Sequence, residues 1–357
     1  MALRKNKGAP VREACIDDSS LNLLLVIVAV ILLFSIMLSA YFTVALISRE
    51  DVPERNDNDT PASADGDYPF YEENITVDLP PVSEALHTID AETIYSEYAI
   101  VIDATENEIV ASLRGNQPIN PASLTKVMTL IVVVENLKSS SSLDEVLTIE
   151  HGQDQHSGFG FKPGDKLTVR DLLYASILLS DGVACLTLAD YIAGSEANFV
   201  MLMNEKVQEL GLKNTFFKNC TGLYQEGHQS TCRDMGIIMA YAIQNRLCAS
   251  VLSTKSFPLS DNYMPETGNT YTLWHQMLVQ QMEDKGVKLK NGTIIGAKSG
   301  YTEENTSGRC LITHVKGKNN HDYIIVTAKA PTGDPYKDEK WLPATKDLVA
   351  LCDEYVK

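Results

Sequence analysis

The sequence predicts an α+β fold, in which an antiparallel sheet is flanked by helices and joined to an all-helical subdomain, with an N-terminal transmembrane helix in addition. Strand patterns occur at both ends of the region after residue 86 and helical patterns fill its middle, so strands from the two ends are expected to meet in one sheet. The expected strands cover residues 98–103, 108–113, 293–298, 309–315 and 322–328. The expected helices cover residues 122–137, 169–179, 183–192, 197–210, 231–244 and 342–355, and residues 138–168 are expected to form loops.

A long uncharged run near the N-terminus predicts the membrane anchor. No charged residue occurs from Leu21 to Ile47, whereas a spanning helix needs only about 20 apolar residues. Four basic residues precede the run, which favours a cytoplasmic N-terminus. A cleaved signal peptide is the alternative, but its apolar core typically has only about 7–15 residues. We therefore expect a cytoplasmic tail at 1–20, a single-pass anchor in the cell membrane at 21–47, an acidic, proline-rich stalk at 48–85 and an extracytoplasmic folded domain at 86–357.

Composition and charge limit the function classes. With 357 residues, of which 44% are hydrophobic, the chain can bury at least one full domain core. The formal net charge of −17 argues against nucleic acid as a partner, because phosphate binding needs a basic surface. Six of the seven cysteines follow the anchor, where they could form three disulfides or remain buried thiols. No cysteine or histidine spacing matches a metal site, so we expect neither a metal nor another cofactor.

The first motif with chemical meaning is Ser123-Leu124-Thr125-Lys126, which leads into an apolar helical run. Residues three apart on a helix share a face, so the amine of Lys126 can reach the hydroxyl of Ser123. A serine needs an adjacent base to become a nucleophile, and a desolvated lysine can provide one. On these four residues alone the alternative is favoured, namely a helix-capping serine followed by a solvated lysine.

Two further stretches bear on that choice. Ser180-Asp181-Gly182 lies at the junction of two expected helices. Lys298-Ser299-Gly300, followed by Tyr301 and Thr302, ends an apolar strand. A lysine and a hydroxyl on an open strand edge can bind a carboxylate, and the glycine admits a ligand close to the backbone. A plain strand end with a turn is the alternative for the second stretch.

In this order and together, the three stretches resemble the Ser-x-x-Lys, Ser-x-Asn and Lys-[Thr/Ser]-Gly set of class A β-lactamases and penicillin-binding proteins. Within that superfamily the chain resembles the low-molecular-weight penicillin-binding proteins, the serine-type D-Ala-D-Ala carboxypeptidases. The resemblance runs from about Tyr98 to Thr332. It is carried by residues 121–129, 192–195, 222–223, 227–228, 230–231 and 296–302. It implies the β-lactamase/DD-peptidase-like form of the α+β fold.

The resemblance also implies roles for the motif residues. Ser123 would attack the carbonyl of the penultimate D-alanine of a peptidoglycan stem peptide and form an acyl-enzyme. Lys126 would accept the serine proton, and Ser180 would relay a proton toward the nitrogen of the departing D-alanine. β-Lactams would acylate the same serine and act as inhibitors.

A second group of residues would bind the substrate. By the same resemblance, Lys298, Ser299 and Thr302 would hold the terminal carboxylate of the peptide, beside Gly300. Backbone N–H groups of Ser123 and Tyr301 would form the oxyanion hole.

The chain departs from the family pattern at two places. Gly182 stands where the family usually has asparagine, so the side-chain amide that would recognise the substrate is missing. Only a short helical segment follows Thr332, so the β-rich second domain of many relatives is expected to be absent.

Two other functions are alternatives: a sensor, which the first departure makes possible, and a β-lactamase, which shares the fold and the three motifs. A penicillin-binding sensor or pseudo-enzyme would bind or be acylated without turning over peptides, and the loss of the asparagine makes this reading possible. The hydrolase is preferred, because such sensors usually carry a cytoplasmic partner domain and the twenty residues before the expected anchor are too few for one. A β-lactamase is the less favoured reading, because no Glu-x-x-Leu-Asn-like stretch lies between Ser123 and Lys298.

Overall fold

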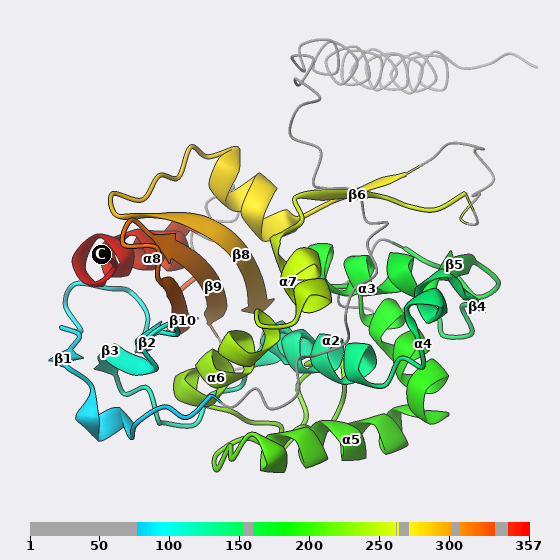
Figure 1. Ribbon diagram of the computed structural model, residues 1–357, viewed down its shortest axis with the longest axis horizontal. Coiled ribbons are helices and arrows are strands. Elements are labelled where there is room, and N and C mark those ends of the chain that lie inside the picture. The colour runs from blue at the N-terminus through cyan, green and yellow to red at the C-terminus, as the bar shows by residue number, and fades with distance from the viewer. Residues whose placement is uncertain (1–76, 153–159, 262, 264–270, 302–307, 333–341) are drawn as a thin grey trace, which may run out of the picture. The chain divides into compact units, whose positions relative to one another are not determined.

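The computed structural model describes residues 77–357, apart from 153–159, 262, 264–270, 302–307 and 333–341 (Figure 1). The chain divides into two compact units, residues 1–64 and 65–357, and all described residues belong to the second. The predicted anchor at 21–47 therefore lies outside the described residues. Within the described part no single helix is long and apolar enough to cross a membrane. Two helices bent by 112° against each other, α6 (Cys232–Ala242) and α7 (Arg246–Ser253), meet that criterion as a pair by length and composition.

A six-stranded sheet forms the β part of this unit, and strands from both ends of the domain meet in it as predicted (Figure 1). Its strands are β1 (His87–Thr88), β2 (Tyr98–Asp103), β3 (Glu108–Leu113), β8 (Gly292–Tyr301), β9 (Arg309–Gly317) and β10 (Asp322–Ala330). Their order across the sheet is β1-β3-β2-β10-β9-β8, and every pairing except that of β1 with β3 is antiparallel. The strand that carries the Lys-Ser-Gly motif, β8, is therefore an edge strand.

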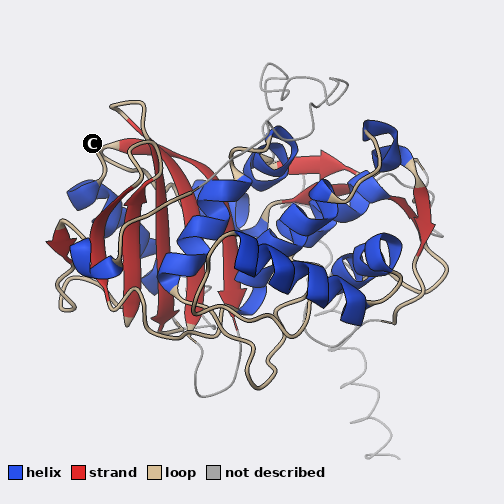
Figure 2. Ribbon diagram, turned by 60° about the horizontal axis from the view of Figure 1, so that its bottom comes forward, coloured by secondary structure: helices blue, strands red, loops and turns tan. Residues whose placement is uncertain are grey.

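Both faces of the sheet are apolar, because helices cover each of them (Figure 2). In β2, Ile100 and Ile102 belong to a core shared with α6 (Cys232–Ala242), whereas Ala99 and Val101 belong to a second core shared with α8 (Leu342–Tyr355). Side chains alternate between the two faces of a strand, so a strand buried on both faces is apolar throughout.

The helical subdomain lies beside the sheet and packs around one central helix. Its elements are η3 (Ala122–Leu124), α2 (Thr125–Glu135), η4 (Ser140–Asp144), α3 (Val169–Leu178), α4 (Gly182–Ala193), α5 (Glu196–Glu209) and α7 (Arg246–Ser253). Ten of the eleven residues of α2 are buried, and it contacts α3, α4, α5, α6 and α7. Side-chain caps set the other starts: Thr168 and Asp171 form a capping box on α3, while Asp181 and Ser195 cap α4 and α5.

Several short elements lie where the sequence predicted loops or where no helix or strand was assigned. Two hairpins, β4 (Val146–Thr148) with β5 (Lys166–Thr168) and β6 (Ser256–Pro258) with β7 (Thr272–Trp274), consist of three-residue strands. Three residues are too few to show an alternating pattern, which is why the expectation of loops at 138–168 was incomplete. A π-helix, η5 (Gln276–Glu283), precedes β8.

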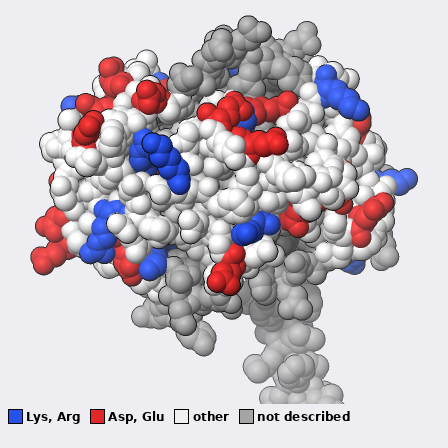
Figure 3. Space-filling model, turned by 90° about the horizontal axis from the view of Figure 1, so that it is seen from below, with Lys and Arg blue, Asp and Glu red and all other residues white. Residues whose placement is uncertain are grey.

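The N-terminal edge of the described part packs against the domain, although the sequence assigned residues up to 85 to the stalk. Leu79 is buried in the core, η2 (Val82–Glu84) follows it, and the guanidinium of Arg233 donates to the carbonyls of Leu79 and Pro80. On the face shown in Figure 3, acidic and basic side chains are interspersed rather than gathered by sign.

Candidate active site

The first motif begins with a strained turn that two glycines hold in place. Ala122 has a φ of +48°, a left-handed conformation that is unfavourable for a residue with a Cβ. Gly222, with a φ of +81°, packs so closely on this turn that a Cβ there would overlap the carbonyl oxygen of Ala122. On the β8 side, a Cβ on Gly300 would lie 2.9 Å from the carbonyl oxygen of Pro121 and 3.1 Å from the nitrogen of Ser123. The backbone of Ser123 is thus clamped between the edge strand and the Gly222 loop.

Lys126 points back at Ser123 from the first turn of α2. Its Nζ lies 3.1 Å from Ser123 Oγ and 2.5 Å from the carbonyl oxygen of Thr221. The lysine is only 1% exposed, and burial lowers its pKa below the ordinary range. Ser123 is the middle residue of η3, and the N-cap positions of η3 and α2 are Pro121 and Leu124. The alternative of a helix-capping serine with a solvated lysine is therefore wrong.

The second and third motifs meet in one hydrogen bond. Ser180, whose φ is +60°, lies between α3 and α4, and its Oγ is 2.9 Å from Lys298 Nζ on β8. Lys298 also donates to the carbonyl of Ser299 at 2.9 Å. Burial lowers the pKa of Lys298 well below its usual value, and the charge of Lys126 lowers it further, so the two lysines lie within electrostatic reach of each other.

The structure gives the middle motif a different role from that of the family pattern. The carboxylate of Asp181 caps α4 by accepting a hydrogen bond from the backbone of Ala184, and it is 1% exposed. Gly182 is the first residue of α4 and offers no side chain. Neither residue provides the amide group of the family motif.

The remaining predicted residues lie at the end of β8. Ser299 and Gly300 pair with Leu311 and Cys310 of β9. The ring of Tyr301 is 38% exposed and stacks under the guanidinium of Arg309 at 3.7 Å. Thr302 lies outside the described residues.

Sequence reasoning missed the contribution of the loop between α5 and α6. The carbonyl of Thr221 accepts from Lys126, and the buried His228 contacts Thr125 at the start of α2. The glycines and the histidine of this loop could have signalled a close approach, but no side-chain pattern predicts where a backbone carbonyl will point.

The six cysteines beyond the predicted anchor are all buried thiols in the structure. Two of them, Cys185 and Cys220, interact electrostatically with Lys126, and burial raises the pKa of Cys185 to about 11. A thiol with so high a pKa is a poor nucleophile at neutral pH. Ser123 therefore remains the candidate nucleophile.

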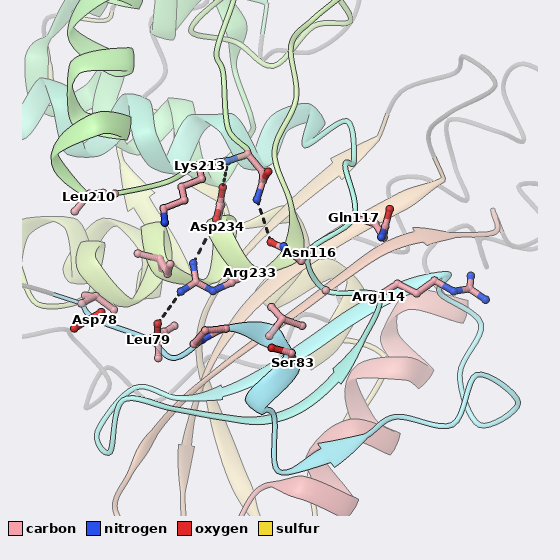
Figure 4. A pocket seen from close by; sticks show the side chains of 17 residues that line it. Asp78, Leu79, Ser83, Arg114, Asn116, Gln117, Leu210, Lys213, Arg233 and Asp234 are labelled. Atoms are coloured by element: carbon pink, nitrogen blue, oxygen red, sulfur yellow. Dashed lines mark hydrogen bonds and ion pairs between the residues drawn. The ribbon is translucent and has the colours of Figure 1, made fainter.

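A cavity of about 650 Å³ lies apart from this site, between residues 77–83 and the start of α6 (Figure 4). None of the residues of the three motifs lines it. Arg233 inside it is engaged with the carbonyl of Leu79, and Asn214 donates to Asn116 across its wall. The Arg233 contact holds the N-terminal segment against the domain, and the Asn214–Asn116 contact joins two loops of the domain.

A serine with a buried lysine base, beside a second lysine on an edge strand, defines the chain as a candidate acyl-transferring serine enzyme. A family model for D-alanyl-D-alanine carboxypeptidases matches residues 85–332. The chain belongs to this family.

Individual relatives agree with the family model. The D-alanyl-D-alanine carboxypeptidase DacF of Bacillus subtilis is 32% identical over 237 residues, which cover 66% of this chain and 57% of DacF. DacC of Escherichia coli is 35% identical over 170 residues, covering 44% of this chain and 42% of DacC. Among solved structures, penicillin binding protein 5 of Haemophilus influenzae is similar with a TM-score of 0.60 and 28% identity, over 73% of this chain and 71% of that one. The chain thus spans about half the length of the two curated relatives.

Proposed function

We propose that this chain is a serine-type D-Ala-D-Ala carboxypeptidase that removes the terminal D-alanine from peptidoglycan stem peptides. The contact of 3.1 Å between Lys126 Nζ and Ser123 Oγ carries the proposal, because a buried lysine of lowered pKa is a suitable base for a serine. Membership of the carboxypeptidase family supports the choice of substrate.

The reaction is an acyl transfer in two steps. Ser123 Oγ attacks the carbonyl carbon of the penultimate D-alanine and its proton passes to Lys126. The N–H groups of Ser123 and Tyr301 would stabilise the oxyanion, and such a donor is typically worth about 3–4 kcal/mol in the transition state. The carbon–nitrogen bond then breaks as Ser180 relays to the departing amine the proton that Lys126 took from Ser123. Water then hydrolyses the ester, which releases the shortened peptide and returns a proton to Ser123 Oγ.

Substrate selection falls to the end of β8. Lys298 would bind the terminal carboxylate of the peptide together with Ser299 and Thr302. Its Nζ already contacts Ser180 at 2.9 Å, so the group that binds the carboxylate and the group that protonates the leaving amine are held together. Penicillin, which also carries a carboxylate beside an acylating carbonyl, would use the same contacts.

We also propose that residues 21–47 anchor the chain in the cell membrane, with the N-terminus in the cytoplasm and the enzymatic unit outside. The support is the uncharged run and the four basic residues before it. A membrane attachment suits a polymeric substrate in the cell wall.

Intact mass of the full-length chain after incubation with penicillin tests the proposal. The parent protein should gain the mass of one penicillin, and Ser123→Ala should gain none while remaining folded. Lys126→Ala should be acylated very slowly, because the serine would lose its base. Equal labelling of the parent and Ser123→Ala would show that the nucleophile is misassigned.

A penicillin-binding protein without peptide turnover is the second candidate, and Gly182 favours it because the side-chain amide is missing. Release of D-alanine from a peptide ending in D-Ala-D-Ala distinguishes the two: turnover supports the carboxypeptidase, and an adduct without turnover supports the sensor. Rapid release of hydrolysed penicillin would instead indicate a β-lactamase.

A further inference from the structure

The loop between α5 and α6 carries a buried histidine for which the reaction scheme has no role. His228 is 4% exposed and lies between the loop and the first residue of α2. The backbone N–H of Lys218 donates to its Nδ1 at 3.1 Å, and its Nε2 lies 2.8 Å from Thr125 Oγ1. One imidazole thus contacts both the middle of the loop, at Lys218, and the helix that bears Lys126.

These two contacts assign the proton of the ring. Nδ1 accepts a hydrogen bond from an amide, so it carries no proton, and the proton of the neutral imidazole is on Nε2. Nε2–H therefore donates to Thr125 Oγ1. A doubly protonated ring would direct Nδ1–H at the N–H of Lys218, two donors facing each other, so the contacts require the neutral form.

The segment that His228 encloses reaches the catalytic groups. Between Lys218 and His228, Thr221 places its carbonyl 2.5 Å from Lys126 Nζ, and Gly222 packs on the backbone of Ala122. Asn219 holds the turn by accepting from the N–H of Gly222 at 2.7 Å. Displacing the loop from α2 would therefore move two things together: the carbonyl that accepts from Lys126, and the glycine that supports the turn at residues 121–123, here called the nucleophile turn.

The contact of Lys126 with the Thr221 carbonyl matters more in this chain than the family pattern would suggest. Gly182 cannot offer Lys126 a side-chain amide. Among the residues that the structure describes, Lys126 donates to Ser123 Oγ and to the Thr221 carbonyl. The orientation of the amine toward Ser123 then depends on where the loop holds that carbonyl.

We propose that His228 is a positioning residue: as the neutral Nε2–H tautomer it ties the Thr221–Gly222 turn to α2 and thereby aims Lys126 at Ser123. The inference rests on the proposed function of Ser123 and Lys126. The charged groups near the ring favour a neutral imidazole. The positive charge of protonated Lys126 disfavours a second positive charge on His228, and the ammonium of Lys218 lies over the ring of Phe216. Burial and the charge of Lys126 lower the pKa of His228 to about 4.

Two variants of the full-length chain test the kinetic part. His228→Ala removes both contacts, whereas the amide of His228→Gln can still accept from Lys218 N–H and donate to Thr125 Oγ1. We expect the maximal rate of acylation by penicillin to fall about 10–100-fold in His228→Ala, as a displacement of about 1 Å would cause, with little change in the concentration that half-saturates it. His228→Gln should stay within about threefold of the parent. His314→Gln, on β9 and bonded to Asp322 instead, is the matched control and should match the parent.

The inference is overturned if His228→Ala acylates at the parent's rate, or if His228→Gln loses as much as His228→Ala. If His228 had a purely structural role, both variants would be less stable to heat. The maximal rate of acylation would then not fall selectively while the half-saturating penicillin concentration stayed constant. Nitrogen NMR of the imidazoles gives a test independent of activity. The His228 ring should show a protonated Nε2 and an unprotonated Nδ1, unchanged from pH 8 to pH 5, and titration near pH 6.5 would refute the proposed bridge. A parent that forms no penicillin adduct would instead refute the proposed function, while the NMR result would still decide the state of His228.

Discussion

The clamp on the nucleophile turn gives the sharpest prediction, because a single methyl group should disrupt it. Gly222 has a φ of +81°, and a Cβ added there would overlap the carbonyl oxygen of Ala122 and lie 2.9 Å from the nitrogen of Ser123. Both neighbours are backbone atoms, so no side chain can rotate away. In Gly222→Ala the loop must separate from the turn that carries Ser123.

The magnitude has two parts. A left-handed conformation costs a residue with a Cβ roughly 1–2 kcal/mol. Overpacking in a close-packed region typically adds about 1–3 kcal/mol. The free energy of unfolding should therefore fall by about 2–5 kcal/mol, and a displacement of about 1 Å at the nucleophile should slow acylation about 100-fold.

Gly211→Ala separates these two parts. Gly211 also has a positive φ, +64°, but no atom lies within 4 Å of a Cβ placed there. This variant should lose only the conformational part, about 1–2 kcal/mol, and acylate like the parent. Urea unfolding gives the free energies, and the time course of the penicillin adduct by mass gives the rates. If Gly222→Ala loses no more stability and no more activity than Gly211→Ala, the close packing of the loop on the turn does not exist in solution.

Two further predictions concern buried ionisable groups. Lys298→Ala should raise the half-saturating concentration of a D-Ala-D-Ala peptide at least about tenfold, because hydrogen bonds to charged groups are worth about 1.5–3 kcal/mol. Steady-state kinetics measure this concentration. An unchanged value would contradict the assignment of Lys298 to the substrate carboxylate. Burial lowers the pKa of His228 to about 4 and that of His275 to about 3. Below pH 6.5 these histidines are protonated in the unfolded chain but remain neutral in the folded chain. The free energy of unfolding is therefore highest above pH 6.5 and falls as the pH approaches the folded-state pKa values. At about 1.4 kcal/mol per pKa unit, each histidine should lower the free energy of unfolding by roughly 2 kcal/mol between pH 7 and pH 5. Urea unfolding of His275→Gln should show about half of the combined fall, and a parent stability that does not change over this range would contradict both assignments.

The parts of the fold that the sequence predicted are those with a strong local pattern. The five longer strands and six helices lie close to their expected positions, because each buries a continuous or periodic set of apolar side chains. The bounds differ mainly at the start of α2, where the expected helix divides into η3 and α2 at the strained turn of Ala122. The short hairpins are stabilised by tertiary contacts that no local pattern records. Helix α7 was missed although Asn245 caps its start and its buried residues Leu247, Cys248, Val251 and Leu252 form one apolar face.

The candidate site divides in the same way. Ser123 and Lys126 were predictable as neighbours, because the geometry of one helical turn sets their spacing. The contact of Ser180 with Lys298 joins residues 118 positions apart, and only the resemblance to a family suggested it. The contributions of Thr221 and His228 depend on backbone direction and on a tautomer, and the sequence alone determines neither.

The two buried lysines have opposite requirements under the proposed reaction, and a bound substrate carboxylate reconciles them. Lys126 must be neutral to accept the proton of Ser123, whereas Lys298 must be charged to bind a carboxylate. Burial lowers the pKa of both, and a positive charge on one disfavours a positive charge on the other. A carboxylate that binds at Lys298 favours the protonated form of that lysine and largely cancels its charge, so burial remains the cause that lowers the pKa of Lys126. The substrate's own carboxylate would thus keep Lys298 charged while Lys126 stays neutral through burial, and a peptide without a free carboxylate would lose affinity.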